Sequence, residues 1–355
     1  MQFIKNVSLW GTLCDIGIEN GKFAFIGKTD EDGRDFGGAK IFPGLIDIHS
    51  HGAIGVDTMY ADFEELSRFY LEQGTTTWYP TTMTMPFSDI ARATGAKTEF
   101  EGGASIPGFH LEGPFINKKY KGAQNAEYVA IPDFSLLEAC PRAKLITVAP
   151  ESEGAIEFIK RASAAGLVVC LGHTDADYEQ SRAAFEAGAS CLTHTYNAMP
   201  GIHHRSPGPI AAGADAGAYA QLISDGIHVH PAAVRLLVKL YGADRVVLIS
   251  DSIEAAGMPD GDYKLGGLDV CVRDGVARTK GGALAGSTST LLDCVRCAIS
   301  FGIPERDAFK MATETPAALM KLNKGKIEVG YDADFIITDE NYRLVTAAAM
   351  GRLCK

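Results

Sequence analysis

Six residues along the chain carry side chains that could bind a metal ion or move a proton, and each follows a short apolar segment. They are His49, His51, Glu112, His173, His194 and Asp251. Imidazole nitrogens and a carboxylate oxygen suit Zn²⁺ or Fe²⁺ and leave coordination positions open for water. A single histidine after a strand is more often a structural, hydrogen-bonded residue. Six such residues in comparable positions predict a shared metal site.

The spacing of these residues indicates how they would divide the chemistry. His49 and His51 are two residues apart, so on a strand their side chains point the same way and can bind one ion together. The other histidines and the glutamate supply further ligands. Asp251 would lie opposite as a proton carrier, because a water activated by a metal must lose a proton to attack an electrophile.

Eight short segments rich in apolar and β-branched residues alternate with amphipathic stretches, which is typical of βα units around a parallel sheet. The segments are 45–51, 75–82, 106–113, 144–150, 167–174, 190–197, 219–226 and 245–252. Eight strands fit a closed (β/α)₈ barrel, and an open doubly wound sheet is the alternative. In a parallel barrel the carboxyl ends of all the strands open on one face, so the six residues would converge there.

The two ends of the chain do not alternate in this way. Residues 1–43 and 326–355 contain short strand-like segments separated by glycine and aspartate turns. We expect them to pair into a small β-domain beside a barrel over residues 44–325. Residues 262–281 have the same pattern, and they could contribute strands to that β-domain.

Composition limits the partners of the protein. The 355 residues carry a formal net charge of −11, which argues against nucleic acid and anionic membranes as partners because both require a basic face. The start of the sequence has no signal-peptide pattern, and no apolar run approaches the ~18 residues of a membrane span. The eight cysteines form no disulfide framework. We therefore expect a reduced, cytoplasmic protein.

Local motifs add a resemblance to a known family. PGLIDIHSHG resembles the first-strand signature of the amidohydrolase superfamily, and the later motifs resemble the N-acetylglucosamine-6-phosphate deacetylases within it. These later motifs are GFHLEGPFINKKYKGA, LGHTDADYEQ, THTYNAMPGIHHRSPG, SDGIHVHP, ISDSIEAAG, AGSTSTLLDCVR and KGKIEVGYDADFIITD. The resemblance runs from about residue 41 to 340 in the order of the family.

The resemblance implies a fold, a reaction and a metal arrangement. The fold would be a (β/α)₈ barrel with a small β-sandwich domain formed from both chain ends. The reaction would be hydrolysis of the N-acetyl amide of N-acetylglucosamine 6-phosphate, with Asp251 as general base and acid. Glu112 would bridge two Zn²⁺ or Fe²⁺ ions, one held by the His49 and His51 pair and the other by His173 and His194. A single ion at Glu112, His173 and His194 is the alternative.

The resemblance also implies a set of substrate-binding positions. They are Ala123, Gln124, Asn197, Ala198, Arg205, Asp225, His228, Leu284, Ala285 and Gly286. The planar fork of Arg205 suits a phosphate, and in the family this arginine can reach across a dimer interface, so a homodimer is implied. Where this chain has Gln124 the family normally has histidine. Glutamine can donate a hydrogen bond but carries no charge, which leaves the sugar and the acyl group open.

Other functions stay as alternatives. The same hydrolysis could act on a related N-acyl amino sugar phosphate, such as N-acetylgalactosamine 6-phosphate. A D-aminoacylase or a cyclic-amide hydrolase on the same barrel is more distant, and the HLEGPF and HHR motifs argue against it. A non-catalytic barrel would have lost ligands, whereas all the metal and proton-transfer positions are occupied here.

Overall fold

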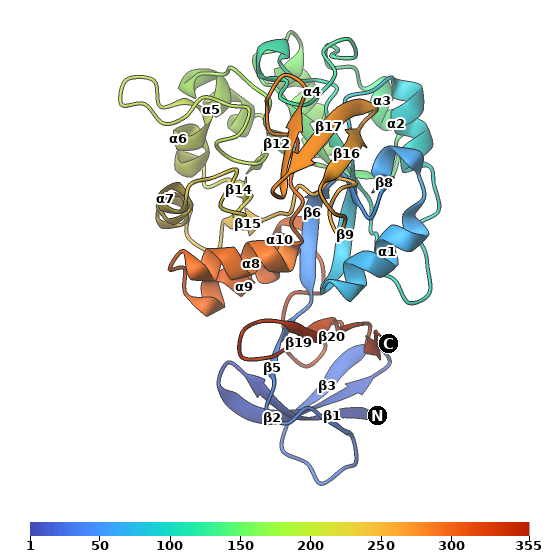
Figure 1. Cartoon of the computed structure of the whole chain (residues 1–355). Coiled ribbons are helices and arrows are strands. Elements are labelled where there is room, and N and C mark those ends of the chain that lie inside the picture. The colour runs from blue at the N-terminus through green and yellow to red at the C-terminus, as the bar shows by residue number, and fades with distance from the viewer. Residues whose placement is uncertain (355) are drawn as a thin grey trace.

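The computed structural model describes residues 1–354, in which eight parallel strands form a barrel above a smaller β-domain (Figure 1). The barrel strands are β6 (Leu45–Ser50), β9 (Thr75–Thr82), β10 (Phe109–Glu112), β11 (Ala143–Val148), β12 (Val168–Leu171), β13 (Cys191–Leu192), β14 (Tyr219–Leu222) and β15 (Val246–Leu248). Each strand pairs in parallel with the next one along the chain. Seven of the eight predicted segments contain one of these strands, and segment 144–150 overlaps β11, which begins one residue earlier, so the predicted (β/α)₈ barrel is confirmed.

The barrel closes through its last and first strands near the mouth. The backbone N–H of Asp251, beyond β15, donates to the carbonyl of His49 at 2.9 Å. The N–H of His51 donates to the carbonyl of Ser252 at 2.7 Å. These two bonds bring the end of the eighth strand directly against the end of the first.

Alternate residues of each strand face two different apolar layers. In β15, Val247 lies in a cluster that includes Ile46 and Leu145, whereas Val246 and Leu248 pack in the layer that contains the helices. This alternation follows from the two-residue period of a strand. Because both faces are buried, the strands read as nearly continuous apolar runs.

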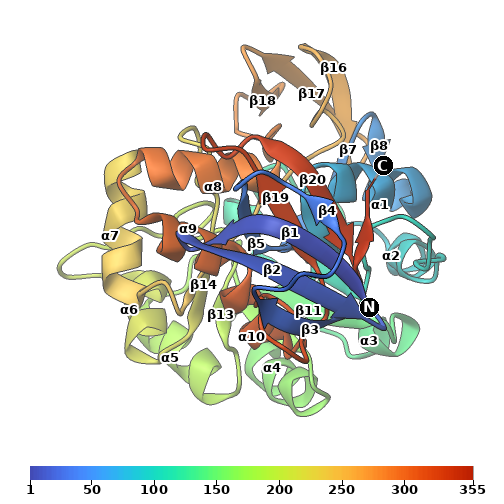
Figure 2. The same ribbon diagram turned by 90° about the horizontal axis from the view of Figure 1, so that it is seen from below.

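Helices surround the barrel, as the intervening amphipathic stretches predicted (Figure 2). They are α1 (Phe63–Glu72), α2 (Phe87–Thr94), α3 (Ser135–Ala139), α4 (Ala155–Ala164), α5 (Tyr178–Glu186), α6 (Gly208–Asp215), α7 (Pro231–Tyr241), α8 (Leu291–Ser300), α9 (Glu305–Ala312) and α10 (Glu314–Met320), with the short 3₁₀ helices η1 (Thr58–Tyr60) and η2 (Lys118–Tyr120). The N-terminus of α5 is held by a reciprocal pair of bonds between Asp177 and Gln180. None of the helices within residues 1–354 is long and apolar enough to cross a membrane.

Both ends of the chain build one β-sheet, as predicted. Its strands are β1 (Gln2–Leu9), β2 (Thr12–Glu19), β3 (Lys22–Gly27), β4 (Arg34–Asp35), β5 (Lys40–Pro43), β19 (Phe335–Thr338), β20 (Leu344–Ala349) and β21 (Arg352–Leu353). The sheet folds over its own core, because the rings of Phe23 in β3 and Phe335 in β19 have centroids 6.2 Å apart although three strands separate them in the sheet. The division at residues 43 and 325 stays a prediction.

Residues 262–281 do not join that sheet. They lie in β16 (Gly261–Leu265), β17 (Leu268–Arg273) and β18 (Val276–Thr279), which form a separate antiparallel sheet. The suggestion that they extend the β-domain is therefore wrong. The physical reason is that this segment leaves the barrel after β15, at the carboxyl ends of the strands, whereas the β-domain lies at the opposite end (Figure 1). A two-stranded sheet of β7 (Gly52–Ala53) and β8 (Val56–Asp57) likewise follows the end of β6.

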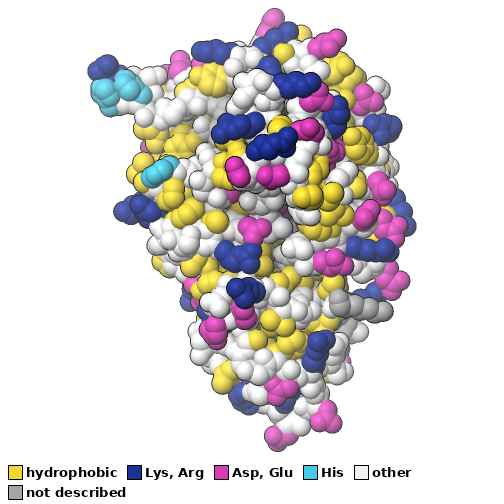
Figure 3. Space-filling model, viewed as in Figure 1, with side chains coloured by type: hydrophobic (Ala, Val, Ile, Leu, Met, Phe, Trp, Pro, Cys, Tyr) yellow, Lys and Arg dark blue, Asp and Glu magenta, His cyan; other side chains and the backbone are white. Residues whose placement is uncertain are grey.

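The face shown in Figure 3 carries basic and acidic side chains in a mixed distribution. Among the described residues drawn on this face, Lys and Arg do not gather into a broad basic area. The formal net charge of the whole chain is −11.

A buried ion pair joins the barrel to the β-domain, and its loss should be costly. The Lys324 ammonium lies 2.7 Å from the Asp334 carboxylate and 3.0 Å from Oγ1 of Thr77 in β9. The change Lys324→Met leaves the carboxylate buried and unpaired, which costs about 3–5 kcal/mol. Equilibrium unfolding in urea measures that cost.

The control for this prediction is a nearby lysine in an exposed pair. Lys326 lies 3.8 Å from Glu328 at the surface, and Lys326→Met should change the free energy of unfolding by about 1 kcal/mol or less. Equal losses in the two variants would contradict the role assigned to Lys324.

Candidate active site

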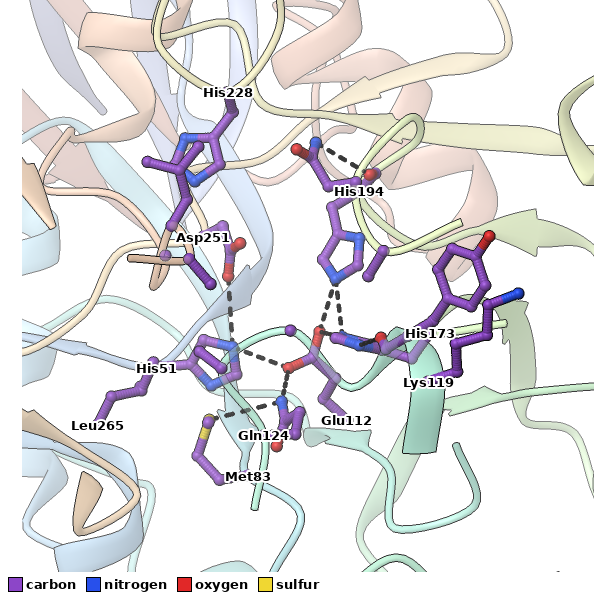
Figure 4. Close-up of a pocket in the computed structure, with 18 residues that line it drawn as sticks. His51, Met83, Glu112, Lys119, Gln124, His173, His194, His228, Asp251 and Leu265 are labelled. Carbon is purple, nitrogen blue, oxygen red and sulfur yellow. Dashed lines mark hydrogen bonds and ion pairs between the residues drawn. The ribbon is translucent and has the colours of Figure 1, made fainter. Parts of the chain in front are cut away.

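The six chemically capable residues converge at the carboxyl ends of the barrel strands, as predicted. His49 is in β6 and Glu112 ends β10, while His173, His194 and Asp251 follow β12, β13 and β15. All of them are buried. With the exception of His49, which lies behind the wall, they line one cavity of about 340 Å³ (Figure 4).

The backbone turns sharply where three of these residues leave their strands. His173, His194 and Asp251 have φ angles of 48°, 25° and 49°. The left-handed region costs a residue with a side chain of the order of 1–3 kcal/mol and is concentrated at functional sites. The turn places each side chain over the barrel mouth instead of continuing the strand.

Glu112 lies between two pairs of histidines. Its Oε1 is 3.2 Å from Nε2 of His173 and 3.0 Å from Nε2 of His194. On the other side, its Oε2 is 3.3 Å from Nε2 of His51, and its Oε1 is 3.2 Å from Nε2 of His49. Two sets of three ligand atoms result, and Glu112 belongs to both.

The outer nitrogens of the histidines indicate what the inner nitrogens can do. Nδ1 of His51 faces the carbonyl of Thr81 at 3.2 Å, and Nδ1 of His173 faces the carbonyl of Tyr120 at 2.9 Å. A carbonyl only accepts, so each Nδ1 carries the proton and each Nε2 of a neutral ring presents a lone pair. Lone pairs then face the acceptor oxygens of Glu112, and a divalent cation between them satisfies both. The donor set therefore fits Zn²⁺ or Fe²⁺.

The electrostatics of the cluster also require positive charge at its centre. Burial would lower the pKa of His51, but hydrogen bonds and charge from Asp251 and Glu112 raise it to about 10. Burial would raise the pKa of Asp251, but His49 and His51 lower it to about 2. The histidines likewise hold the pKa of Glu112 well below its ordinary value, against the effect of burial. The two carboxylates thus stay charged, and cations must balance them.

Most of the substrate-binding residues expected from the resemblance lie in the cavity wall. They are Ala123, Gln124, Asn197, Ala198, His228, Leu284 and Gly286. Asp225 lies behind His228, with its Oδ2 2.7 Å from Nδ1 of that ring, and Ala285 is fully buried. A Cβ at Gly286 would approach the carbonyl oxygen of Asp251 to 2.8 Å, and the φ angle of Gly286 is 64°. Only glycine fits there without strain. Contact of these residues with substrate stays a prediction.

Arg205 lies outside this cavity. Its side chain is exposed beside the exposed His204, 2.7 Å from Nε2 of that ring, in a separate cleft with Asp177 and Tyr178. His110, expected to be structural, is fully buried and contacts the carbonyl of Ile48 and the hydroxyl of Thr147.

Sequence reasoning did not identify several residues that support the site. Gln221 in β14 is fully buried, and its Oε1 accepts a hydrogen bond from Nδ1 of His49 at 2.9 Å. The available signal was a polar amide inside an otherwise apolar strand, since buried amides need partners. Met83, Lys119 and Leu265 also line the cavity, but nothing in their local sequence distinguishes them.

Comparison with known proteins agrees with a metal-binding hydrolase site at the barrel mouth. Residues 41–353 match the model of the Amidohydrolase family. N-acetylglucosamine-6-phosphate deacetylase of Vibrio furnissii is 38% identical over 94% of this chain and 89% of its own length. N-acetylgalactosamine-6-phosphate deacetylase of Escherichia coli O157:H7 is 37% identical over 88% of this chain and 86% of its own. A mutant N-acetyl-D-glucosamine-6-phosphate deacetylase of Mycobacterium smegmatis, solved in complex with N-acetyl-D-glucosamine-6-phosphate, superposes with a TM-score of 0.92 at 31% identity, covering 99% of both chains.

The two ligand sets predict separable losses of metal. The change His194→Ala or His49→Ala removes a ligand from one set only, so each should release one ion. The change Glu112→Ala removes the shared ligand and should release both. Elemental analysis of the purified variants measures this, with the exposed His230→Ala as a control that keeps the metal content of the unaltered protein. A Glu112 variant that keeps both ions would contradict the shared role.

Proposed function

Because the chain belongs to the amidohydrolase family, we propose that it hydrolyses the N-acetyl amide of N-acetylglucosamine 6-phosphate, giving glucosamine 6-phosphate and acetate. The observation that carries this proposal is the pair of histidine sets around Glu112 at the floor of a cavity of about 340 Å³. The relatives named above act on N-acetylated amino sugar phosphates and match most of this chain. The chain is accordingly an enzyme, a metal-dependent hydrolase.

The site is proposed to hold two divalent ions, Zn²⁺ or Fe²⁺, with Glu112 as the shared ligand. Use of a single ion at Glu112, His173 and His194 is the alternative. A bound ion lowers the pKa of a water toward neutrality and polarises the acetyl carbonyl. Both effects are needed because the carbonyl carbon of an amide is a poor electrophile.

Asp251 is the proposed proton carrier. Its Oδ1 lies 3.3 Å from Nε2 of His51, at the side of the cavity that faces His228 (Figure 4). Charged at neutral pH, the carboxylate can accept the proton of the attacking water and deliver it to the amine nitrogen that leaves. Glu112 cannot take this role because the histidines on both sides engage its two oxygens.

Protonated His228, whose ring is held by Asp225, is proposed to bind the phosphate. Burial lowers the pKa of His228, but the hydrogen bond and charge of Asp225 outweigh it and raise the pKa above its ordinary value. Nδ1 is engaged by Asp225, so Nε2 is the nitrogen left for a ligand. A phosphate oxygen accepts well from an imidazolium.

We also propose that the enzyme is a homodimer in which Arg205 enters the cavity of the second subunit. In its own subunit Arg205 is exposed and lies outside the cavity. Leu236 and Leu240, one turn apart on α7, are 53% and 44% exposed, and a second subunit would cover such an apolar face. The mass of the protein in solution tests this proposal directly.

A cytoplasmic location is proposed from the cysteines. Seven of them carry free thiols in the structure, namely Cys14, Cys140, Cys170, Cys191, Cys271, Cys294 and Cys297. A reducing compartment keeps thiols in this state.

The relative from Escherichia coli O157:H7 supports a second candidate, N-acetylgalactosamine 6-phosphate, because its identity to this chain is nearly as high. A panel of N-acetyl hexosamine phosphates and their unphosphorylated forms, assayed for acetate release, distinguishes the two. The proposed function requires metal-dependent release that is fastest with the gluco phosphate. Faster release from the galacto phosphate would select the second candidate, and no release from any member would reject both.

Replacement of Asp251 tests the proton carrier. The change Asp251→Asn keeps the shape but removes the ability to carry a proton, so kcat should fall by roughly 10²–10⁴. Metal content and KM should stay close to those of the unaltered enzyme. A parallel loss of metal would reassign Asp251 as a ligand, and a change in kcat below about tenfold would remove it from the mechanism.

The pH dependence of KM tests this role of protonated His228. His228 binds phosphate while it is protonated, so this affinity is present below the raised pKa of His228 and is lost as the pH rises through it. In Asp225→Asn the pKa falls, and KM should begin to rise at a lower pH than in the unaltered enzyme. The substrate titrates identically in both, so only the difference between the two profiles is interpreted. Superimposable profiles would contradict the role of Asp225.

A further inference from the structure

Gln124 occupies an unusual place in the cavity wall. It is 2% exposed, it follows η2, and its side chain lies between Met83 and Glu112 (Figure 4). The resemblance suggested that an amide here would contact the sugar or the acyl group. The contacts of the amide instead favour a role in holding Glu112.

The orientation of this amide follows from its partners. The backbone N–H of Thr84 lies 2.7 Å from one end of the Gln124 amide. An N–H can only donate, so that end is the carbonyl oxygen, and the other end is the NH₂ group. The NH₂ group donates to Oε2 of Glu112 and lies 3.7 Å from Sδ of Met83.

These contacts leave little of Gln124 for a substrate. Its carbonyl is taken by the backbone of Thr84, and one N–H is taken by a carboxylate. Charge-assisted bonds of this kind are roughly twice as strong as neutral ones. A sugar hydroxyl would have to displace one of them.

The same bond constrains Glu112. Oε1 of Glu112 faces His49, His173 and His194, whereas Oε2 faces His51 and Gln124. A carboxylate that bridges two ions through both of its oxygens presents one oxygen to each ion, and this mode of binding needs a fixed rotation of the carboxylate plane. The N–H of Gln124 holds Oε2 on the His51 side and leaves a lone pair of that oxygen free.

We propose that Gln124 is a positioning residue that fixes Glu112 as the bridging ligand and thereby secures the ion held with His49 and His51. It does not read the substrate. This inference rests on the proposed metal-dependent function. It gives Gln124, which departs from the family pattern, a part in the metal site.

The test is metal binding to Gln124→Leu, which has a similar volume and no donor. Metal-free protein is titrated with Zn²⁺ by calorimetry, with a competing chelator, so that no substrate is needed. The affinity for the second ion should fall by about 10–100-fold, as for other residues that orient metal ligands. The first ion should bind as in the unaltered protein, and kcat should fall while KM stays close to its original value.

Two further variants make the result decisive. Gln124→Met repeats the measurement with an unbranched side chain if the leucine variant does not fold. Met83→Leu removes the sulfur contact of the amide but keeps its bond to Glu112, so its affinity for both ions should be unchanged.

Unchanged affinities in Gln124→Leu, with KM raised about tenfold as for a lost hydrogen bond, would overturn the proposal. An equal loss of affinity for both ions would also overturn the proposal, because Gln124 contacts only the Oε2 oxygen of Glu112. The outcome is separable from the proposed function. An unaltered protein inactive on the sugar panel, but with Gln124-dependent binding of the second ion, would reject the function and support this inference.

Discussion

The constraint on which the site depends is the burial of a charged carboxylate among four imidazoles. Glu112 is only 2% exposed and gains little solvation from water, so its charge must be balanced by cations or protons on the histidines. Asp251 and Glu112 together raise the pKa of His51 to about 10, against the effect of burial, and His49 and His51 in turn lower the pKa of Asp251 to about 2. When the histidines are neutral, their Nε2 lone pairs face the oxygens of Glu112, and both kinds of atom are acceptors. Metal ions between them can take the place of the protons that would otherwise balance the charge.

The barrel makes such a cluster possible by bringing strand ends together. Residues separated by up to two hundred positions in the sequence meet because eight parallel strands end on one face. The lower interior is filled by alternate apolar residues such as Ile46 and Val247, which pack together in one buried cluster. The left-handed turns at His173, His194 and Asp251 then direct these side chains over the barrel mouth. The strands thus set the position of each ligand and the turns set its direction.

The barrel and the residues that could hold a metal were accessible from the sequence because both depend on local signals. Apolar β-branched runs marked all eight strands, and a histidine or an acidic residue at the end of five of them marked a position at the mouth. Pairing between distant segments has no such signal, so residues 262–281 could not be separated from the β-domain by their pattern alone. Likewise the sequence showed that Gln124 was unusual but not which way its amide points, since that depends on the backbone N–H of Thr84. Gln221 is similar, because its role depends on the orientation of His49.

The β-sheet built from both ends of the chain has a consequence for synthesis on the ribosome. β5 precedes the first barrel strand, yet its partner β19 is made only after the whole barrel. During translation the amino-terminal strands therefore wait with an unpaired edge, which is the kind of edge that recruits other chains. The nascent β-hairpins β1 to β3 can pair among themselves in this interval. β19, β20 and β21, which are made after the barrel strands, then complete the sheet. The buried bond between Lys324 and Asp334 joins the finished sheet to the barrel.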